Sequence, residues 1–354
     1  MKKKELKHII PFVIILLTFT ILFLSNTKKN NEQFKPEAKT MLNLQSADML
    51  YYNEEYVDAI QLYKSIIKST PQNYGAYIGL GKSYTKLKLY GEAIKTFEET
   101  FKLNYHDFRT YSGLGFAYYL NEDYNKAYYN FKVAYKLNTI DRGVIYYLIH
   151  VYSALGMYDN AISLTNSQLQ KEPQSAHLYR RLAFAYLLKG NDSEALVNAE
   201  KSIQLNTTLV ENSWTLATIH LYQGDIQKAL DEFNKISSIY KNNYVYESLS
   251  IIYSLNGNTE KSKENSQLAA SYPVHSLSLS TLGFALLENG AYERAIEEFN
   301  AASKVKPDYY LPYKGLGEAY LLLGDKVKAK EYLGRALELN EFDKEIPELL
   351  DQTG

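Results

Sequence analysis

The fold is decided by a stretch of 34 residues, 74–107, which reads YGAYIGLGKSYTKLKLYGEAIKTFEETFKLNYHD. Leu80 and Tyr84 are four residues apart, and so are Ala93 and Phe97 in its second half. This spacing places each pair on one face of a helix and predicts two helices joined by a short turn. Such a pair leaves an apolar face uncovered, so it needs similar neighbours to bury that face.

Similar neighbours follow one another along most of the chain. A small residue recurs every 33 or 34 residues, and in eight of its nine occurrences a leucine stands thirteen positions before it. In six units a glycine stands five positions before the small residue, where the first helix must end in a left-handed turn. The small residue lets the paired helices approach closely. The small residues are Ala59, Ala93, Ala127, Ala161, Ala195, Ala229, Ser262, Ala295 and Ala329.

The combination of Tyr77, Leu80, Gly81 and Tyr84 with the later Ala93 and Phe97 resembles the tetratricopeptide repeat family. Residues 310–343 carry a similar set. The resemblance implies an all-α fold, a right-handed α-solenoid of about nine helix-turn-helix units, and residues 344–354 are expected to form a capping helix and tail. The nine units are 40–73, 74–107, 108–141, 142–175, 176–209, 210–242, 243–275, 276–309 and 310–343.

The N-terminal segment predicts a membrane anchor. Residues 1–8 form a basic flank, residues 9–27 an apolar run and residues 28–39 a polar linker. The 20 residues between Lys7 and Lys28 contain no charged side chain and would span roughly 30 Å as a helix. We expect an uncleaved transmembrane signal-anchor with a cytoplasmic N-terminus and an extracytoplasmic body. A cleaved signal peptide and a buried core helix are the alternatives.

Composition and motifs argue against several classes of activity. The chain has 354 residues, no cysteine and a net charge of −1, which excludes thiolate chemistry and disfavours nucleic acid as a partner. Residues 76–83 fit a relaxed phosphate-loop pattern, but Gly81 falls inside a predicted helix, so we expect no nucleotide. The six histidines have no metal-ligand spacing, and no nucleophile motif occurs. We therefore expect neither an enzyme nor a bound cofactor or metal.

The resemblance also implies a binding groove lined by the first helix of each unit. This predicts a protein-interaction scaffold tethered to the membrane through residues 9–27, which holds a protein or peptide partner and assists assembly of an envelope or membrane complex. Carbohydrate or cell-envelope polymer binding, or a role as accessory subunit of an envelope enzyme, is the alternative. Later units offer a more acidic surface, with Glu211, Glu247, Phe284, Glu288 and Glu318. The predicted groove residues are Lys82, Lys86, Arg109, Phe116, Tyr119, Tyr146, His150, His177, Arg180, Arg181, Phe184 and Trp214.

Overall fold

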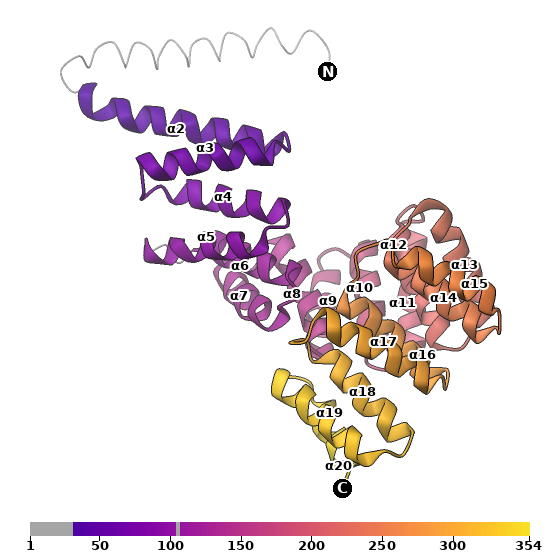
Figure 1. Ribbon diagram of the computed structural model, residues 1–354. Helices are drawn as coiled ribbons and strands as arrows, with labels where there is room; N and C mark the ends of the chain where they lie inside the picture. The colour runs from indigo at the N-terminus through magenta and orange to yellow at the C-terminus, as the bar shows by residue number, and fades with distance from the viewer. Residues whose placement is uncertain (1–30, 104–106) are drawn as a thin grey trace, which may run out of the picture. The chain divides into compact units, whose positions relative to one another are not determined.

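A computed structural model describes residues 31–103 and 107–354, and within these ranges the chain is an array of 19 α-helices with no strand (Figure 1). The predicted all-α repeat solenoid is thereby confirmed for this part of the chain. The helices are α2 (Asn31–Tyr52), α3 (Tyr56–Ser69), α4 (Tyr74–Lys86), α5 (Tyr90–Lys102), α6 (Phe108–Leu120), α7 (Tyr124–Leu137), α8 (Arg142–Ala154), α9 (Tyr158–Leu169), α10 (Ala176–Leu188), α11 (Asp192–Leu205), α12 (Val210–Tyr222), α13 (Ile226–Ile239), α14 (Asn243–Leu255), α15 (Thr259–Ala269), α16 (Ser276–Glu288), α17 (Tyr292–Val305), α18 (Leu311–Leu322), α19 (Lys326–Leu339) and α20 (Glu345–Asp351).

The chain divides into two compact units, one ending at His106 and the other running from Asp107 to Gly354. The predicted anchor, residues 9–27, lies outside the described residues. Among the helices that are described, none is both long enough and apolar enough to cross a membrane.

Two kinds of residue make the turn between the helices of a pair. From the pair α8–α9 onward this turn contains a glycine with positive φ, such as Gly156 at 70°. In the first three pairs the same place is held by Glu54, Lys88 and Glu122, with φ between 57° and 65°. The backbone therefore takes the left-handed conformation in every turn, and the first three pairs do so without glycine.

Glycines in the first helices make room for rings from the second helices. A Cβ atom on Gly81 would lie 2.7 Å from the ring of Phe97, and one on Gly115 would lie 2.7 Å from the ring of Phe131. Both rings are 1% exposed. Gly81, which the phosphate-loop pattern includes, thus lies inside α4 and serves helix packing.

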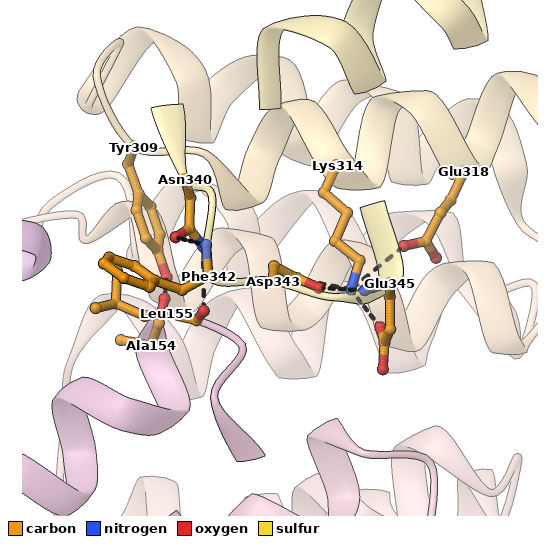
Figure 2. Close-up of polar contacts among 9 residues, drawn as sticks. All are labelled: Ala154, Leu155, Tyr309, Lys314, Glu318, Asn340, Phe342, Asp343 and Glu345. Carbon is orange, nitrogen blue, oxygen red and sulfur yellow. Dashed lines mark hydrogen bonds and ion pairs between the residues drawn. The ribbon is translucent and has the colours of Figure 1, made fainter. Parts of the chain in front are cut away.

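The second unit folds back on itself, so that its last helices pack against its early ones (Figure 2). The Tyr309 hydroxyl donates a hydrogen bond to the carbonyl of Ala154 (3.0 Å). The Asn340 side-chain amide donates one to the carbonyl of Leu155 (3.1 Å), and the Phe342 ring centre lies 5.3 Å from that of Tyr128. These contacts join the segment after α17 and the segment after α19 to α7 and the end of α8. The repeat pattern predicts stacking of successive pairs but does not predict this closure.

Candidate functional site

Three first helices, α6, α8 and α10, bring aromatic and cationic side chains together. We call this cluster the arginine–tyrosine site. On α8 the spacing of Tyr146, Tyr147 and His150 places all three side chains on one side of the helix. The site consists of Phe116, Tyr119, Tyr146, Tyr147, His150, Arg180 and Arg181.

Ring contacts hold the aromatic half of the site together. The ring centre of Tyr147 lies 4.8 Å from that of Phe116 and 5.0 Å from that of Tyr119. His150 meets the Tyr119 ring edge to face at 5.1 Å. Such contacts favour a fixed arrangement of the rings. The aromatic side chains therefore form a half-buried surface with a fixed arrangement of rings.

The cationic half consists of two neighbouring arginines from α10. The Arg181 guanidinium lies over the face of Tyr146, with its carbon 4.2 Å from the ring centre. Arg181 is 8% exposed and Arg180 is half-buried. The Nε atoms of both are buried without a hydrogen-bond partner. Within residues 31–103 and 107–354, neither guanidinium forms an ion pair with a carboxylate.

The two positive charges shift the titration of their neighbours. Burial lowers the pKa of Arg180, and the adjacent Arg181 lowers it further. Burial and both arginines hold the pKa of His150 well below its usual value, so this imidazole is neutral at neutral pH. Burial acts to raise the pKa of Tyr146, but the charges of Arg181 and Arg180 and hydrogen bonds from both outweigh it and lower that pKa.

Such a site is suited to an anion. A guanidinium presents N–H groups in a planar fork that matches a carboxylate, and an unpaired buried donor is costly until a ligand satisfies it. The adjoining rings can hold an apolar side chain of the same ligand. The neutral His150, whose Nδ1 is buried without a partner, can accept or donate one further hydrogen bond.

The structure distributes the predicted groove residues unevenly. Six of the twelve fall in the arginine–tyrosine site, which also contains Tyr147. Tyr147 occupies the sixth position of its unit, as the predicted groove residue Arg181 does in the next unit, so the same reasoning could have found it. The six are Phe116, Tyr119, Tyr146, His150, Arg180 and Arg181.

The other predicted residues have different surroundings. Lys82 and Lys86 lie exposed on α4 of the first unit. The Arg109 guanidinium pairs with Asp107 (2.9 Å) beside the start of α6. Trp214 packs on Tyr240, with ring centres 5.1 Å apart.

Two more of these residues lie on α10 itself. His177 is exposed on the first turn, and Phe184 is half-buried nearer the end of the helix. A binding role for any of these residues stays a prediction.

Comparison with models of known protein families gives matches to repeat families near both ends of the helical array. The profile of the tetratricopeptide repeat family matches residues 44–101 and residues 286–352. Between them, residues 111–254 match the family described as intraflagellar transport protein 56.

The chain is also similar to individual proteins. Human tetratricopeptide repeat protein 13 is 27% identical over 179 residues, which cover 49% of this chain and 21% of that protein. Bovine BBSome complex member BBS4 is 23% identical over 188 residues, which cover 52% of this chain and 36% of that protein. The chain thus spans only a fifth to a third of the length of these relatives. Among solved structures, YrrB, described as a tetratricopeptide repeat protein with an unusual peptide-binding site, is 22% identical with a TM-score of 0.44, covering 48% of this chain and 88% of that one.

Proposed function

Because the chain carries tetratricopeptide repeats at both ends of its array, we propose that it is a protein-interaction scaffold whose arginine–tyrosine site binds an acidic peptide segment. The carboxylate of the segment binds the guanidiniums of Arg180 and Arg181. An apolar side chain next to that carboxylate packs on the rings of Tyr119 and Tyr147.

One observation carries this proposal: two adjacent guanidiniums lie in a largely buried site, and no carboxylate in the described part of the chain pairs with them. Bringing two like charges together and removing them from water is unfavourable, and a bound carboxylate offsets that cost through charge-assisted hydrogen bonds. A fold that only needed α10 to pack would be served better by apolar residues at these positions.

Fluorescent peptides matched in length and aromatic content test the proposal on the full chain. One peptide carries internal Asp and Glu with an amidated end, one carries only a free C-terminal carboxylate, and one carries no acid. We expect an acidic peptide to bind and the neutral one not to bind. The double variant Arg180→Gln/Arg181→Gln should weaken binding by about tenfold or more, since each charged hydrogen bond contributes about 1.5–3 kcal/mol.

The matched control is Arg335→Gln, on an exposed position of α19 whose guanidinium pairs with Glu338 (2.9 Å). This variant should bind as the unaltered chain does. Equal binding of the acidic and neutral peptides, or unchanged binding by the double variant, would refute the proposal.

We further propose that residues 9–27 tether the scaffold to a membrane with the body on the extracytoplasmic side, where it assists assembly of a membrane or envelope complex. The support is the uncharged run between Lys7 and Lys28 and the excess of lysine before it. Alkaline extraction of membranes should leave the chain in the pellet, and protease added to intact cells should digest the body. Release of the chain by alkaline extraction would contradict the tether.

A further inference from the structure

The fold-back of the second unit encloses a cavity of about 290 Å³. Its floor includes the buried side chains of Tyr158 on α9 and of Leu311 and Lys314 on α18. Its rim includes the exposed Asp192 on α11 and Glu288 on α16. Helices from distant parts of the repeat array thus line one cavity, which exists because the last helices return to the early ones.

Carboxyl groups outnumber cations around this cavity. Asp192, Glu288, Glu318 and Glu345 line it, and the lining cations are Lys189 and Lys314.

Both of these cations already have carboxylate partners that do not line the cavity. Lys189 pairs with Asp159 (2.5 Å), and Lys314 pairs with the fully buried Asp343 (3.2 Å). Lys314 also pairs with Glu345, so Asp192 and Glu288 line the cavity with no ion pair to the described residues, and Glu318 lies 3.9 Å from the Lys314 ammonium.

Lys314 is the centre of the buried charge (Figure 2). Its ammonium also binds Glu345 and lies 3.9 Å from Glu318, one turn along α18. One ammonium therefore serves three carboxylates, which leaves Glu318 only weakly neutralised. Burial raises the pKa of Glu318 to about 7, against the opposing effect of Lys314.

The side chain of one tyrosine, Tyr158, reaches the cavity. Tyr158 is 7% exposed and lines the cavity beside Lys314 and Glu318, and its hydroxyl has no hydrogen-bond partner among residues 31–103 and 107–354. Burial raises its pKa, so it remains a neutral group that can both donate and accept. Apolar walls from Leu187, Tyr222 and Phe284 complete the cavity.

We propose that this cavity binds an organic cation, an alkylammonium or guanidinium group whose charge is held by Glu288 and Glu318 and whose hydrocarbon part lies against the aromatic walls. A hydrogen bond with the Tyr158 hydroxyl satisfies the unpartnered group, and the rings of Tyr222 and Phe284 attract a cation placed over them. The volume is at the small end of ligand-binding cavities, which suits one extended side chain or a small amine.

The same chemistry can come from a lysine or arginine side chain of a partner protein or from a free amine. The experiment therefore titrates the full chain by calorimetry with 1,4-diaminobutane and, separately, with a blocked tripeptide, acetyl-Gly-Arg-Gly-amide. Binding of the diamine alone identifies a free amine as the ligand class, and binding of the tripeptide alone identifies a partner's side chain. If neither probe binds, the proposal is overturned.

Variants locate the binding. Glu288→Gln/Glu318→Gln should weaken the bound probe by about tenfold or more, because two carboxylates are lost. The single variant Glu318→Gln should weaken probe binding less than the double variant does, and Tyr158→Phe should have the smallest effect of the three. Glu331→Gln, on an exposed position of α19 outside the cavity, is the control and should change nothing. Equal affinity in the double variant and the control would overturn the proposal.

The pH dependence gives a second readout that does not require a variant. The groups that face Glu318 are Lys314 on its own helix, Glu345 and Asp343 from the C-terminal segment, Glu288 from α16, Tyr158 from α9 and Tyr222 from α12. Because Glu318 gains its charge as the pH rises through about 7, cation binding should tighten between about pH 6 and pH 8. Binding that is no tighter at pH 8 would contradict the role of Glu318. This site is separate from the arginine–tyrosine site, so Arg180→Gln/Arg181→Gln should not affect it.

Discussion

The side-chain amide of Asn340 donates a hydrogen bond of 3.1 Å to the backbone carbonyl of Leu155, which lies 185 positions earlier in the chain. Asn340 is 2% exposed and Leu155 is 1% exposed, so water cannot replace either partner. The Oδ1 atom of Asn340 also accepts a hydrogen bond from the backbone N–H of Phe342 (3.1 Å). One asparagine thus shapes the turn after α19 and ties that turn to the end of α8.

Asn340→Ala should destabilise the second unit by about 2–3 kcal/mol, because it leaves the buried carbonyl of Leu155 and the partly buried N–H of Phe342 without partners. The free energy of unfolding from urea denaturation checks this. The neighbouring Glu341→Ala is the control, since Glu341 is exposed, and it should stay within about 0.5 kcal/mol. Equal effects of the two substitutions would show that the bond does not stabilise the fold-back.

Gly156 allows the fold-back in a second way. Its φ is 70°, and a Cβ atom there would lie 2.6 Å from a carboxylate oxygen of Asp343. Gly190 has a similar φ of 76°, but a Cβ atom added to Gly190 would have no other atom within 4 Å. Gly190→Ala should therefore cost only the backbone strain, about 1 kcal/mol, and Gly156→Ala should cost clearly more. Urea denaturation measures the loss of unfolding free energy in both variants, and the difference between them is the effect of the contact with Asp343. Equal losses would contradict the close approach of Gly156 and Asp343.

The sequence predicts the helix pairs because their determinants are local. Leucine and alanine at helical spacing, and glycine at the turn, act within about ten residues of one another. The contacts of Asn340, Tyr309 and Phe342 with the α7–α8 region have no such periodic signal. They depend on the small rotation of each helix pair relative to the preceding pair. These rotations add up along the array, and the identity of single residues does not reveal their sum.

Lys88 occupies the turn where later pairs have glycine, with φ of 62°. A side chain in this conformation is strained, so Lys88→Gly should stabilise the first unit by about 0.5–1 kcal/mol. Lys82→Gly, in the interior of α4, should instead destabilise it by about 1 kcal/mol, because glycine is a poor helix former. Thermal denaturation followed by circular dichroism measures both. A loss of stability in Lys88→Gly would show that its side chain stabilises the turn.

The candidate site was predictable only in part. Arg180, Arg181 and Tyr146 occupy groove positions known from the family, and the structure places them in contact. The pairing of Arg109 with Asp107 and the packing of Trp214 on Tyr240 depend on neighbouring side chains, which a residue's position within its repeat does not reveal. The cavity beside Lys314 could not be foreseen, because its walls come together only through the fold-back.

A buried pair of carboxyl groups makes stability depend on pH. Glu298 on α17 is 9% exposed, and burial together with the facing Glu247 raises its pKa to about 8. The folded chain therefore holds this proton more tightly than the unfolded chain does. The resulting stability is complete below the unfolded pKa and is lost as the pH rises through about 8.

The free energy of unfolding should consequently fall as the pH rises toward about 8, and Glu298→Gln should reduce that slope, while the part that comes from the raised pKa of Glu318 remains. Glu297→Gln is the control, because Glu297 is exposed on the same helix, and it should keep the slope. An unchanged slope in Glu298→Gln would assign the whole effect to other groups.

The lowered pKa of Tyr146 provides a direct reporter for the arginine–tyrosine site. Burial alone would raise this pKa, and the charges of Arg181 and Arg180 with their hydrogen bonds lower it. Substituting both arginines by glutamine removes the lowering effects and leaves burial, so the pKa of Tyr146 should rise above the ordinary tyrosine value. A bound carboxylate, which offsets the same positive charges, should raise it in the unaltered chain as well. Carbon-13 NMR of labelled tyrosine, with Tyr146→Phe to assign the signal, measures both shifts. If an acidic peptide bound without moving this signal, the peptide would have to bind elsewhere on the array.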